Sequence, residues 1–446
     1  MNDLAMRDTI AALATAPGRA GVAIVRVSGT GAFDALKRVF RPAMKDCPFV
    51  SHTLYYGHIV SDGEEGDECL AVLMRAPRSY TKEDVAELQI HGGEYAARFA
   101  LDALERCGVR AAQPGEFTLR AFLNGRVDLS RAEAVMRVVG AEGARAARSA
   151  FRQLSGGASR FVLAAQEQLT KMLAALEAAL DYPEEIEEAV TREELQSGAL
   201  RLQTTLLNAC DERGARLMDE GLSVVLFGRP NVGKSSLLNA LLGEERAIVT
   251  DIPGTTRDIV RGHLYLDGVR VNLLDTAGIR ESGEAVEAIG VSRARDAVKG
   301  ADLALFLTEA SNPMTAEDEE VLRAVGDVPR LTVYTKRDLV QGETRDADAL
   351  YVSARTGEGL DALKGRLCAL VKGAGEAPLT MRRHILLARD AAAALENAAR
   401  AFAGGVPLEF GAVELHAALD ALAGITGDRV DEKLLDEVFS TFCVGK

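Results

Sequence analysis

The chain has 446 residues, of which 48% are hydrophobic and 26% are charged, and its formal net charge at pH 7 is −14. This length exceeds what one hydrophobic core supports and predicts about three domains. The acidic balance argues against broad, non-specific binding to nucleic acid but allows a local basic patch. The six cysteines form no C-x-x-C pair, and no stretch has the pattern of a signal peptide or a membrane span. We therefore expect a cytoplasmic protein without a disulfide framework or membrane association.

Residues 1–124 mix strand and helix patterns, and we interpret them as a compact α+β domain. The apolar spacing of Tyr95–Cys107 predicts a helix that ends at Gly108, a residue suited to a helix C-cap. The acidic stretch Asp62–Asp67 contains a glycine and predicts a hairpin tip or a loop. Apolar runs or alternation predict strands at Gly21–Val27, Cys69–Met74 and Val85–Ile90.

Strong helix formers dominate residues 125–217 and return in residues 376–446. Helical spacing resumes over Thr191–Met218 after the acidic stretch that follows Tyr182-Pro183. Breaks between the helices are expected at Gly140, Gly143 and the Gly156-Gly157 pair. We predict that both blocks belong to one helical domain.

Residues 218–375 lie between these helical blocks, and in them strands alternate with helices. That alternation predicts an α/β domain with a mostly parallel sheet. Its insertion into the helical domain requires the two ends of residues 218–375 to lie close together. The predicted strands are Val224–Phe227, His263–Leu266, Val271–Leu274, Leu303–Leu307, Leu331–Tyr334 and Leu350–Val352.

A phosphate-binding motif opens this inserted domain. Gly228–Ser235 fits G-x-x-x-x-G-K-[ST], and it follows a buried strand and precedes helical spacing. The glycines let backbone N–H groups turn towards phosphates, and the helix N-terminus adds positive potential. Lys234 can reach the β- and γ-phosphates, and the Ser235 hydroxyl can ligate magnesium.

Four further stretches distinguish GTP from ATP. A carboxylate follows a strand in Asp275–Gly278, and the polar loop Thr250–Asp258 offers Thr256 to the magnesium ion. Asp338 can accept two hydrogen bonds from N1 and the exocyclic amine of guanine, and Ser353–Arg355 would close the base pocket. The predicted GTP-binding residues are Asn231, Val232, Gly233, Lys234, Ser235, Ser236, Thr250, Asp251, Ile252, Pro253, Gly254, Thr255, Thr256, Asp275, Thr276, Ala277, Gly278, Thr335, Lys336, Asp338, Ser353, Ala354 and Arg355.

These motifs resemble those of the translation-factor class of P-loop GTPases, the TrmE-Era-EngA-YihA-like group. Together with PGEFTLRAFLNGRVDL and the terminal Phe442-Cys443-Val444-Gly445-Lys446, they resemble the bacterial tRNA-modification GTPases of the MnmE (TrmE) family along essentially the whole chain. The resemblance implies an α+β folate-binding and dimerisation domain in residues 1–124. It also implies a helical domain in residues 125–217 and 376–446, and a Ras-like GTPase domain in residues 218–375.

One residue departs from the motif, because Thr335 stands where the base-recognition motif usually has asparagine. A hydroxyl is shorter than an amide, so we expect Thr335 neither to donate to the base as the amide does nor to tether the P-loop. Guanine specificity is expected to persist through Asp338.

The hydrolysis mechanism is also implied by the resemblance. Ile279 occupies the place of the water-orienting glutamine of Ras-type enzymes and cannot orient water. In the family, Glu287 aligns with the water-orienting glutamate and acts with Lys234. The alternative for Glu287 is an ordinary solvated helix residue. A potassium ion replaces the arginine finger, and its implied ligands are Asn231, Thr250, Ile252 and Thr255.

The family's folate contacts map onto Arg26, Glu87, Arg126 and Lys446. A carboxylate suits the N–H donors of the pterin, and cations suit the glutamate tail. Without the resemblance, Arg26 and Glu87 would be interpreted as surface charges at strand ends. Many family members have lysine at the position of Arg126. Cys443 is either an inert terminal cysteine or a reactive thiol.

The sequence thus predicts a potassium-dependent GTP hydrolase that also uses magnesium. With a flavin-dependent MnmG-type partner, it would install an aminomethyl or carboxymethylaminomethyl group on C5 of the wobble uridine of certain tRNAs. The one-carbon unit would come from 5,10-methylene- or 5-formyltetrahydrofolate, and FAD would belong to the partner. A homodimer would assemble with that partner into a heterotetramer or larger complex. The alternative is a regulatory or ribosome-assembly GTPase without modifying activity, for which a basic RNA-binding appendage and no folate domain are expected.

Overall fold

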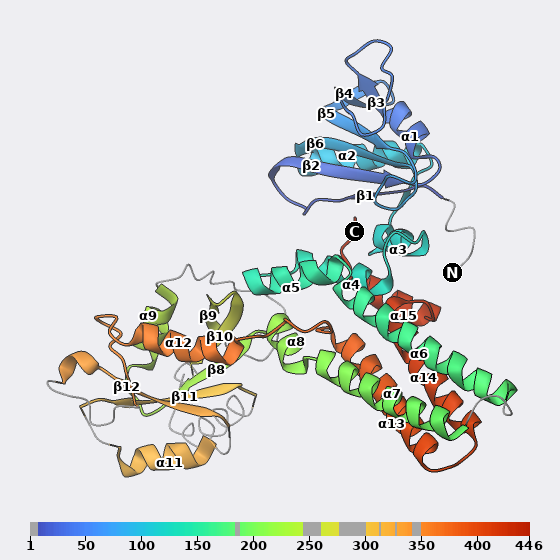
Figure 1. Cartoon of the computed structure of the whole chain (residues 1–446). Helices are drawn as coiled ribbons and strands as arrows, with labels where there is room; N and C mark the ends of the chain where they lie inside the picture. The colour runs from blue at the N-terminus through green and yellow to red at the C-terminus, as the bar shows by residue number, and fades with distance from the viewer. Residues whose placement is uncertain are drawn as a thin grey trace. The chain divides into compact units, whose positions relative to one another are not determined.

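The computed structural model describes residues 8–182, 188–243, 260–275, 300–311, 314–325, 328–340 and 349–446. The chain divides into two compact units (Figure 1). The terminal unit comprises residues 1–136, 153–203 and 390–446, and the central unit comprises residues 137–152 and 204–389. In the described part of the chain, no helix is long and apolar enough to span a membrane.

A seven-stranded sheet forms the N-terminal part of the terminal unit, with strand order β3-β4-β5-β6-β2-β1-β7. Neighbouring strands are antiparallel except for β1 and β7. Helices α1 (Ala32–Val39) and α2 (Glu94–Arg106) pack on it and bury a core that includes Val25, Leu36 and Leu104. The strands are β1 (Ile10–Leu13), β2 (Ala20–Ser28), β3 (Phe40–Pro42), β4 (Leu54–Ser61), β5 (Glu64–Met74), β6 (Val85–Gly92) and β7 (Arg110–Ala111).

The hairpin between β4 and β5 turns more tightly than the sequence predicted. Only Asp62 and Gly63 form the turn, with φ of 52° and 87°. Two consecutive left-handed residues are typical of the two-residue hairpin turn whose twist matches the flanking strands. Glu64 onwards continues β5, where Gly66 leaves room for the Phe99 ring. The turn confirms the predicted hairpin tip, but the tip is shorter than predicted, because residues 64–67 belong to β5.

The helical segments begin and end largely where the glycines predicted. Gly156 has a φ of 85° and precedes α6, which packs on α14. The Thr191–Met218 stretch is broken at Asp211, because this side chain accepts a hydrogen bond from the Gly214 N–H and caps a new helix. The helices are α3 (Glu116–Leu123), α4 (Leu129–Val139), α5 (Ala144–Leu154), α6 (Gly157–Asp181), α7 (Glu188–Ala209), α8 (Glu212–Asp219), α13 (Arg382–Ala403), α14 (Leu408–Thr426) and α15 (Glu432–Ser440).

A six-stranded sheet with the order β13-β12-β11-β8-β10-β9 organises the central unit. All pairs are parallel except β9 with β10, which confirms the predicted α/β fold. The strands are β8 (Leu222–Phe227), β9 (Val260–Leu266), β10 (Val269–Asp275), β11 (Leu303–Glu309), β12 (Arg330–Thr335) and β13 (Leu350–Tyr351). The described helices that follow strands of this sheet are α9 (Lys234–Gly243), α11 (Ala316–Val325) and α12 (Leu360–Val371). The boundaries predicted for the domains, at residues 124, 217 and 375, stay predictions.

Candidate functional site

The P-loop joins the end of β8 to the start of α9. Gly228 has a φ of 145°, and a Cβ there would lie 2.3 Å from the Leu307 carbonyl oxygen of β11. Gly233 has a φ of 97°, and Asn231 lies in the left-handed region at 64°. Only glycine fits the first of these positions, because both the backbone conformation and the space require it.

Lys234 folds back over this loop. Its side chain is 7% exposed, and Nζ donates to the carbonyl oxygens of Gly228 and Arg229 at 2.8 and 2.7 Å. The ammonium therefore sits within the turn, beside the first residues of α9. A cation at a helix N-terminus lined by backbone N–H groups can bind phosphate oxygens.

An ion pair that the sequence analysis missed anchors the loop from outside. Arg229 Nε lies 2.8 Å from Asp318 Oδ1, and Asp318 is fully buried. The other oxygen of Asp318 accepts from the N–H and the hydroxyl of Thr315 at 3.0 and 2.9 Å. A threonine followed three residues later by an acid is a helix-start signal, but it does not reveal the distant arginine.

A cavity of about 460 Å³ lies beside the P-loop, and Asp338 and Ser353 organise it. Ser353 Oγ donates to Asp338 Oδ1 at 2.6 Å, and Arg355 Nε lies 3.1 Å from Oδ2. The Ser353 hydrogen bond, helped by the charge of Arg355 and opposed by burial, lowers the pKa of Asp338. An ionised carboxylate at this place can accept two N–H donors from a planar base. The lining includes Gly233, Ser236, Leu237, Thr335, Lys336, Asp338, Leu339, Val352, Ala354 and Arg355.

Thr335 corrects one expectation. Its hydroxyl donates to the Val232 carbonyl oxygen at 2.6 Å, with the Thr308 carbonyl oxygen at 3.1 Å as a second acceptor. The tether to the P-loop therefore persists despite the shorter side chain. It persists because β12 ends close enough to the loop for a hydroxyl to reach it.

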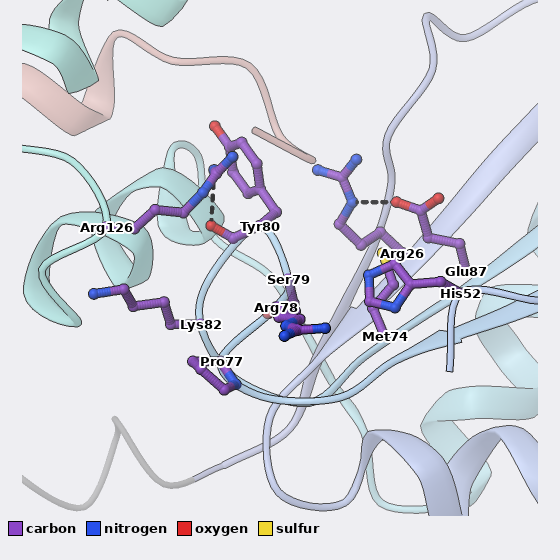
Figure 2. A pocket seen from close by; sticks show the side chains of 10 residues that line it. All are labelled: Arg26, His52, Met74, Pro77, Arg78, Ser79, Tyr80, Lys82, Glu87 and Arg126. Carbon is purple, nitrogen blue, oxygen red and sulfur yellow. Dashed lines mark hydrogen bonds and ion pairs between the residues drawn. The ribbon is translucent and has the colours of Figure 1, made fainter. Parts of the chain in front are cut away.

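A second cavity, also about 460 Å³, lies in the terminal unit (Figure 2). Arg26 of β2 and Glu87 of β6 are register partners, and their Nε and Oε1 atoms are 2.8 Å apart. Arg26 Cζ lies 5.1 Å from the centroid of the Tyr80 ring, and Arg126 Cζ lies 4.7 Å from it. Arg126 also donates to the Tyr80 carbonyl oxygen at 2.9 Å. The structure thus brings together three of the predicted folate residues, Arg26, Glu87 and Arg126.

The loop between β5 and β6 adds cations to this second cavity that the sequence analysis missed. Arg78 and Lys82 line it, and Lys82 Nζ donates to the Gly125 carbonyl oxygen at 2.8 Å. His52 also lines it, while Glu87 is the one carboxylate among its lining residues. The excess of positive charge favours an anionic ligand. No local pattern marks these residues, because a basic side chain in a loop is usually solvated.

Two family models match the chain: "GTP-binding protein TrmE N-terminus" over residues 9–126 and "MnmE helical domain" over residues 129–443. The chain is 43% identical to the tRNA modification GTPase MnmE of Carboxydothermus hydrogenoformans, over 99% of this chain and 100% of that protein. It is 44% identical to the protein of the same name from Chloroflexus aurantiacus, again over 99% and 100%. The chain belongs to the MnmE family of tRNA-modification GTPases.

The fold agrees with this family, since a TrmE N-terminal domain, a helical domain and a P-loop GTPase domain are all present. The G domain of the T. maritima FeoB iron transporter is 27% identical over 34% of this chain and 99% of that chain, with a TM-score of 0.26, which supports no conclusion.

The C-terminal tail of this MnmE-family chain lies against the N-terminal sheet. A Cβ on Gly445 would lie 2.2 Å from the Leu13 carbonyl oxygen, and Leu13 pairs with Val25, the neighbour of Arg26. Lys446 is half-buried and is not among the residues that line the second cavity. Cys443 is exposed, and its carbonyl oxygen accepts from the Gly115 N–H at 3.4 Å.

Several predicted residues lie outside the described part of the chain. For Asp275 only the backbone is described: it ends β10 opposite Leu226, beside the strand that leads into the P-loop. The roles predicted for the others stay predictions: Thr250, Asp251, Ile252, Pro253, Gly254, Thr255, Thr256, Thr276, Ala277, Gly278, Ile279 and Glu287. Among the described residues, no group of three or more His, Cys, Asp or Glu side chains could hold a metal ion.

Proposed function

We propose that this MnmE-family GTPase couples potassium-activated GTP hydrolysis to a folate-dependent modification of C5 of the tRNA wobble uridine. The observation that carries the proposal is the presence of two pockets with different chemistry in one chain. The central unit has a phosphate loop and an ionised carboxylate for a base. The terminal unit has a cationic cavity with an aromatic ring and one carboxylate.

Guanine recognition is assigned to Asp338, ordered by Ser353, and phosphate binding to the P-loop with Lys234. Ser235 at the start of α9 is assigned to magnesium together with Thr256, because a hydroxyl directly after the P-loop lysine suits that ion. Asp275 would act near the same ion, since β10 ends beside β8.

Potassium activation rests on Asn231, whose amide lies on an exposed left-handed residue inside the P-loop. An amide oxygen is a hard ligand of the kind that alkali and alkaline-earth cations prefer. The remaining ligands would be Thr250, Ile252 and Thr255, and Glu287 would orient the attacking water. An ion held there would supply the positive charge that an arginine finger supplies in other GTPases.

The second cavity is assigned to a reduced folate, 5,10-methylene- or 5-formyltetrahydrofolate. The Glu87 carboxylate can accept hydrogen bonds from the amino and ring N–H groups of a pterin. Arg26, which forms an ion pair with Glu87, has its guanidinium beside the Tyr80 ring. Arg126, which lies beside the Tyr80 ring, is assigned to the carboxylates of the glutamate tail, and Lys446 is assigned to the same ligand.

We also propose a homodimer and a flavin-binding partner protein. Tyr56 and Leu70 are register partners on β4 and β5, and their side chains are 52% and 37% exposed, which supports a homodimer through this sheet. The flavin is assigned to an MnmG-type partner, because no G-x-G-x-x-G follows a strand in this chain. The site of action is proposed to be the cytoplasm.

GTP hydrolysis in potassium and in sodium buffers of equal ionic strength tests the mechanism. We expect turnover at least ~10²-fold faster in potassium, the size of a lost transition-state charge contact. Asn231→Ala should remove the difference, while the matched control Asn239→Ala, on the exposed face of α9, should keep it. Turnover that does not depend on the cation would leave a GTPase and remove potassium from its mechanism.

A further inference from the structure

Thr335 lines the described nucleotide pocket beside the P-loop, at the place where the base-recognition motif usually has asparagine. Guanine presents N7 as a hydrogen-bond acceptor, so reading it requires a donor. An asparagine amide at residue 335 carries two N–H donors and can serve the P-loop and a base together. A threonine hydroxyl carries a single proton.

That single proton is already used. Thr335 Oγ1 faces two carbonyl oxygens, those of Val232 at 2.6 Å and Thr308 at 3.1 Å, and both groups are acceptors only. The residue is 4% exposed, so its hydroxyl is directed into the protein. Turning the proton towards a base would leave the Val232 carbonyl without this donor, which costs free energy in a buried place.

Both cationic side chains of the described lining have an acidic partner within the protein. Lys336 Nζ pairs with Glu309, and Arg355 Nε lies 3.1 Å from Asp338. Ser236 stands in the first turn of α9, at the phosphate end of the pocket.

We propose that Thr335 sets the nucleotide specificity of this enzyme at N7: it keeps the P-loop tether, leaves N7 unread, and so lets the enzyme bind and hydrolyse guanosine nucleotides that lack N7. Recognition then falls on the N1 and amino edge, through Asp338. This inference rests on the proposed guanine pocket.

The test compares GDP with 7-deaza-GDP, in which a C–H group replaces N7. Both displace a fluorescent GDP analogue from the full-length protein, and hydrolysis of GTP and 7-deaza-GTP is measured in parallel. For the wild type we expect the two affinities to agree within about 2-fold. Thr335→Asn should restore a donor and make GDP bind about 10-fold more tightly than 7-deaza-GDP, the effect of one hydrogen bond.

Two control variants separate specificity from folding. Thr335→Ser keeps the hydroxyl and should keep the ratio of the two affinities near one. Thr335→Val loses the tether, and should weaken both nucleotides together while the ratio stays near one. Circular dichroism checks that each variant is folded.

A wild-type preference for GDP of 5-fold or more would overturn the inference and leave the guanine pocket intact. A Thr335→Asn protein that is folded and still binds both nucleotides equally would also overturn it, because residue 335 would then not be the determinant. Failure of the wild type to bind either nucleotide would instead contradict the proposed function of the pocket.

Discussion

The two pockets of this chain are built in different ways. The nucleotide pocket is made by short contiguous stretches at the ends of parallel strands, and Gly233 of the P-loop lines it. The second cavity, which we propose binds folate and call the folate pocket, is made by side chains that antiparallel pairing and a loop bring together, among them Arg26, Tyr80, Glu87 and Arg126. The nucleotide pocket is therefore built from local turns, whereas the folate pocket is built from side chains that lie far apart in the sequence.

This difference decides how each pocket responds to change. A backbone-built site depends on a few glycines and on tethers such as those of Thr335 and Arg229. A side-chain-built site depends on the groups that hold its loop. Glu83, in the loop that carries Tyr80 and Lys82, accepts from Ser28 at 2.7 Å and lies 3.2 Å from Arg120. The following predictions separate the two pockets.

The largest expected effect is on base specificity. Asp338→Asn replaces an acceptor by a mixed donor and acceptor, so the preference for GTP over xanthosine triphosphate should fall by up to about 10⁴-fold. Competition between the two nucleotides measures this change. Folate binding should not change, and Asp361→Asn, an exposed residue at the start of α12, serves as the matched control. Retained GTP preference would remove Asp338 from base recognition.

The next effect is on the stability of the part of the terminal unit that holds the loop of the folate pocket. Arg120 is 1% exposed and lies 2.7 Å from Asp8, 2.9 Å from Glu116 and 3.2 Å from Glu83. Arg120→Met would leave these carboxylates without their buried cation and should destabilise this part by about 3–5 kcal/mol. Hydrogen exchange in peptides of β1 and α3 reports the loss. The control Arg106→Met removes an exposed ion pair and should cost less than about 1 kcal/mol; similar effects of both changes would contradict this account.

The same cluster predicts acid sensitivity. Burial raises the pKa of Glu116, but hydrogen bonds from Arg110, the Gln113 N–H and Arg120 outweigh it and leave that pKa below its usual value. A carboxyl whose pKa is lowered by folding contributes stability that is present above its unfolded pKa and lost as pH falls through the folded one. Protection of α3 should therefore fall on acidification in the wild type, and less so in Arg120→Met.

A smaller effect is expected in the folate pocket itself. Glu87→Gln removes the charge that faces Arg26 and the pterin donors, so folate affinity should fall about 10- to 100-fold, the range for one charge-assisted contact. Calorimetric titration with 5-formyltetrahydrofolate measures it, and Glu94→Gln, exposed at the start of α2, is the control. GTP turnover should stay unchanged in both variants. An equal loss of turnover in Glu87→Gln would mean that the pockets do not act separately.

The smallest effect is expected on the pKa of an exposed histidine, His91. The His91 ring lies 2.7 Å from Asp67 Oδ1, and this hydrogen bond raises the pKa of His91 above its ordinary value. The stabilisation is fully present below the unfolded pKa of histidine and is lost as pH rises through the folded pKa. Asp67→Asn should lower the pKa that NMR measures for His91, with both pockets unaffected. An unchanged pKa would show that Asp67 does not hold the ring.

The sequence predicted seven of the ten residues that line the described nucleotide pocket, because they belong to contiguous motifs near strand ends. It did not reveal that Thr335 can reach Val232, since that depends on the spacing of β12 and the P-loop. In the folate pocket, the resemblance supplied Arg26, Glu87 and Arg126, and the residues alone indicated only surface charges. Arg78 and Lys82 were missed, because only the folded loop aims them at the cavity.

Helices and strands were likewise predictable where a local sequence pattern marks them and were missed where it does not. Helix breaks at Gly140, Gly143 and Gly156 were predictable because glycine interrupts a helix through its local backbone preferences alone. The break at Asp211 was missed, because apolar spacing continues through it and the cap is set by one side chain. Short strands such as β1 and β3 carry too few residues to show a period and become strands by pairing with β2 and β4.

The most direct test of the account follows the one-carbon unit. The full-length protein, an MnmG-type partner, unmodified tRNA and GTP are incubated in potassium buffer with ammonium or glycine as the amine donor. The mixture also contains methylenetetrahydrofolate that carries ¹³C in its one-carbon group, and the wobble nucleoside is analysed by mass spectrometry. The account predicts labelled C5-modified uridine with the wild type, and much less with Glu87→Gln although its GTP turnover is normal. Modified uridine without the label, or equal labelling with Glu87→Gln, would contradict it.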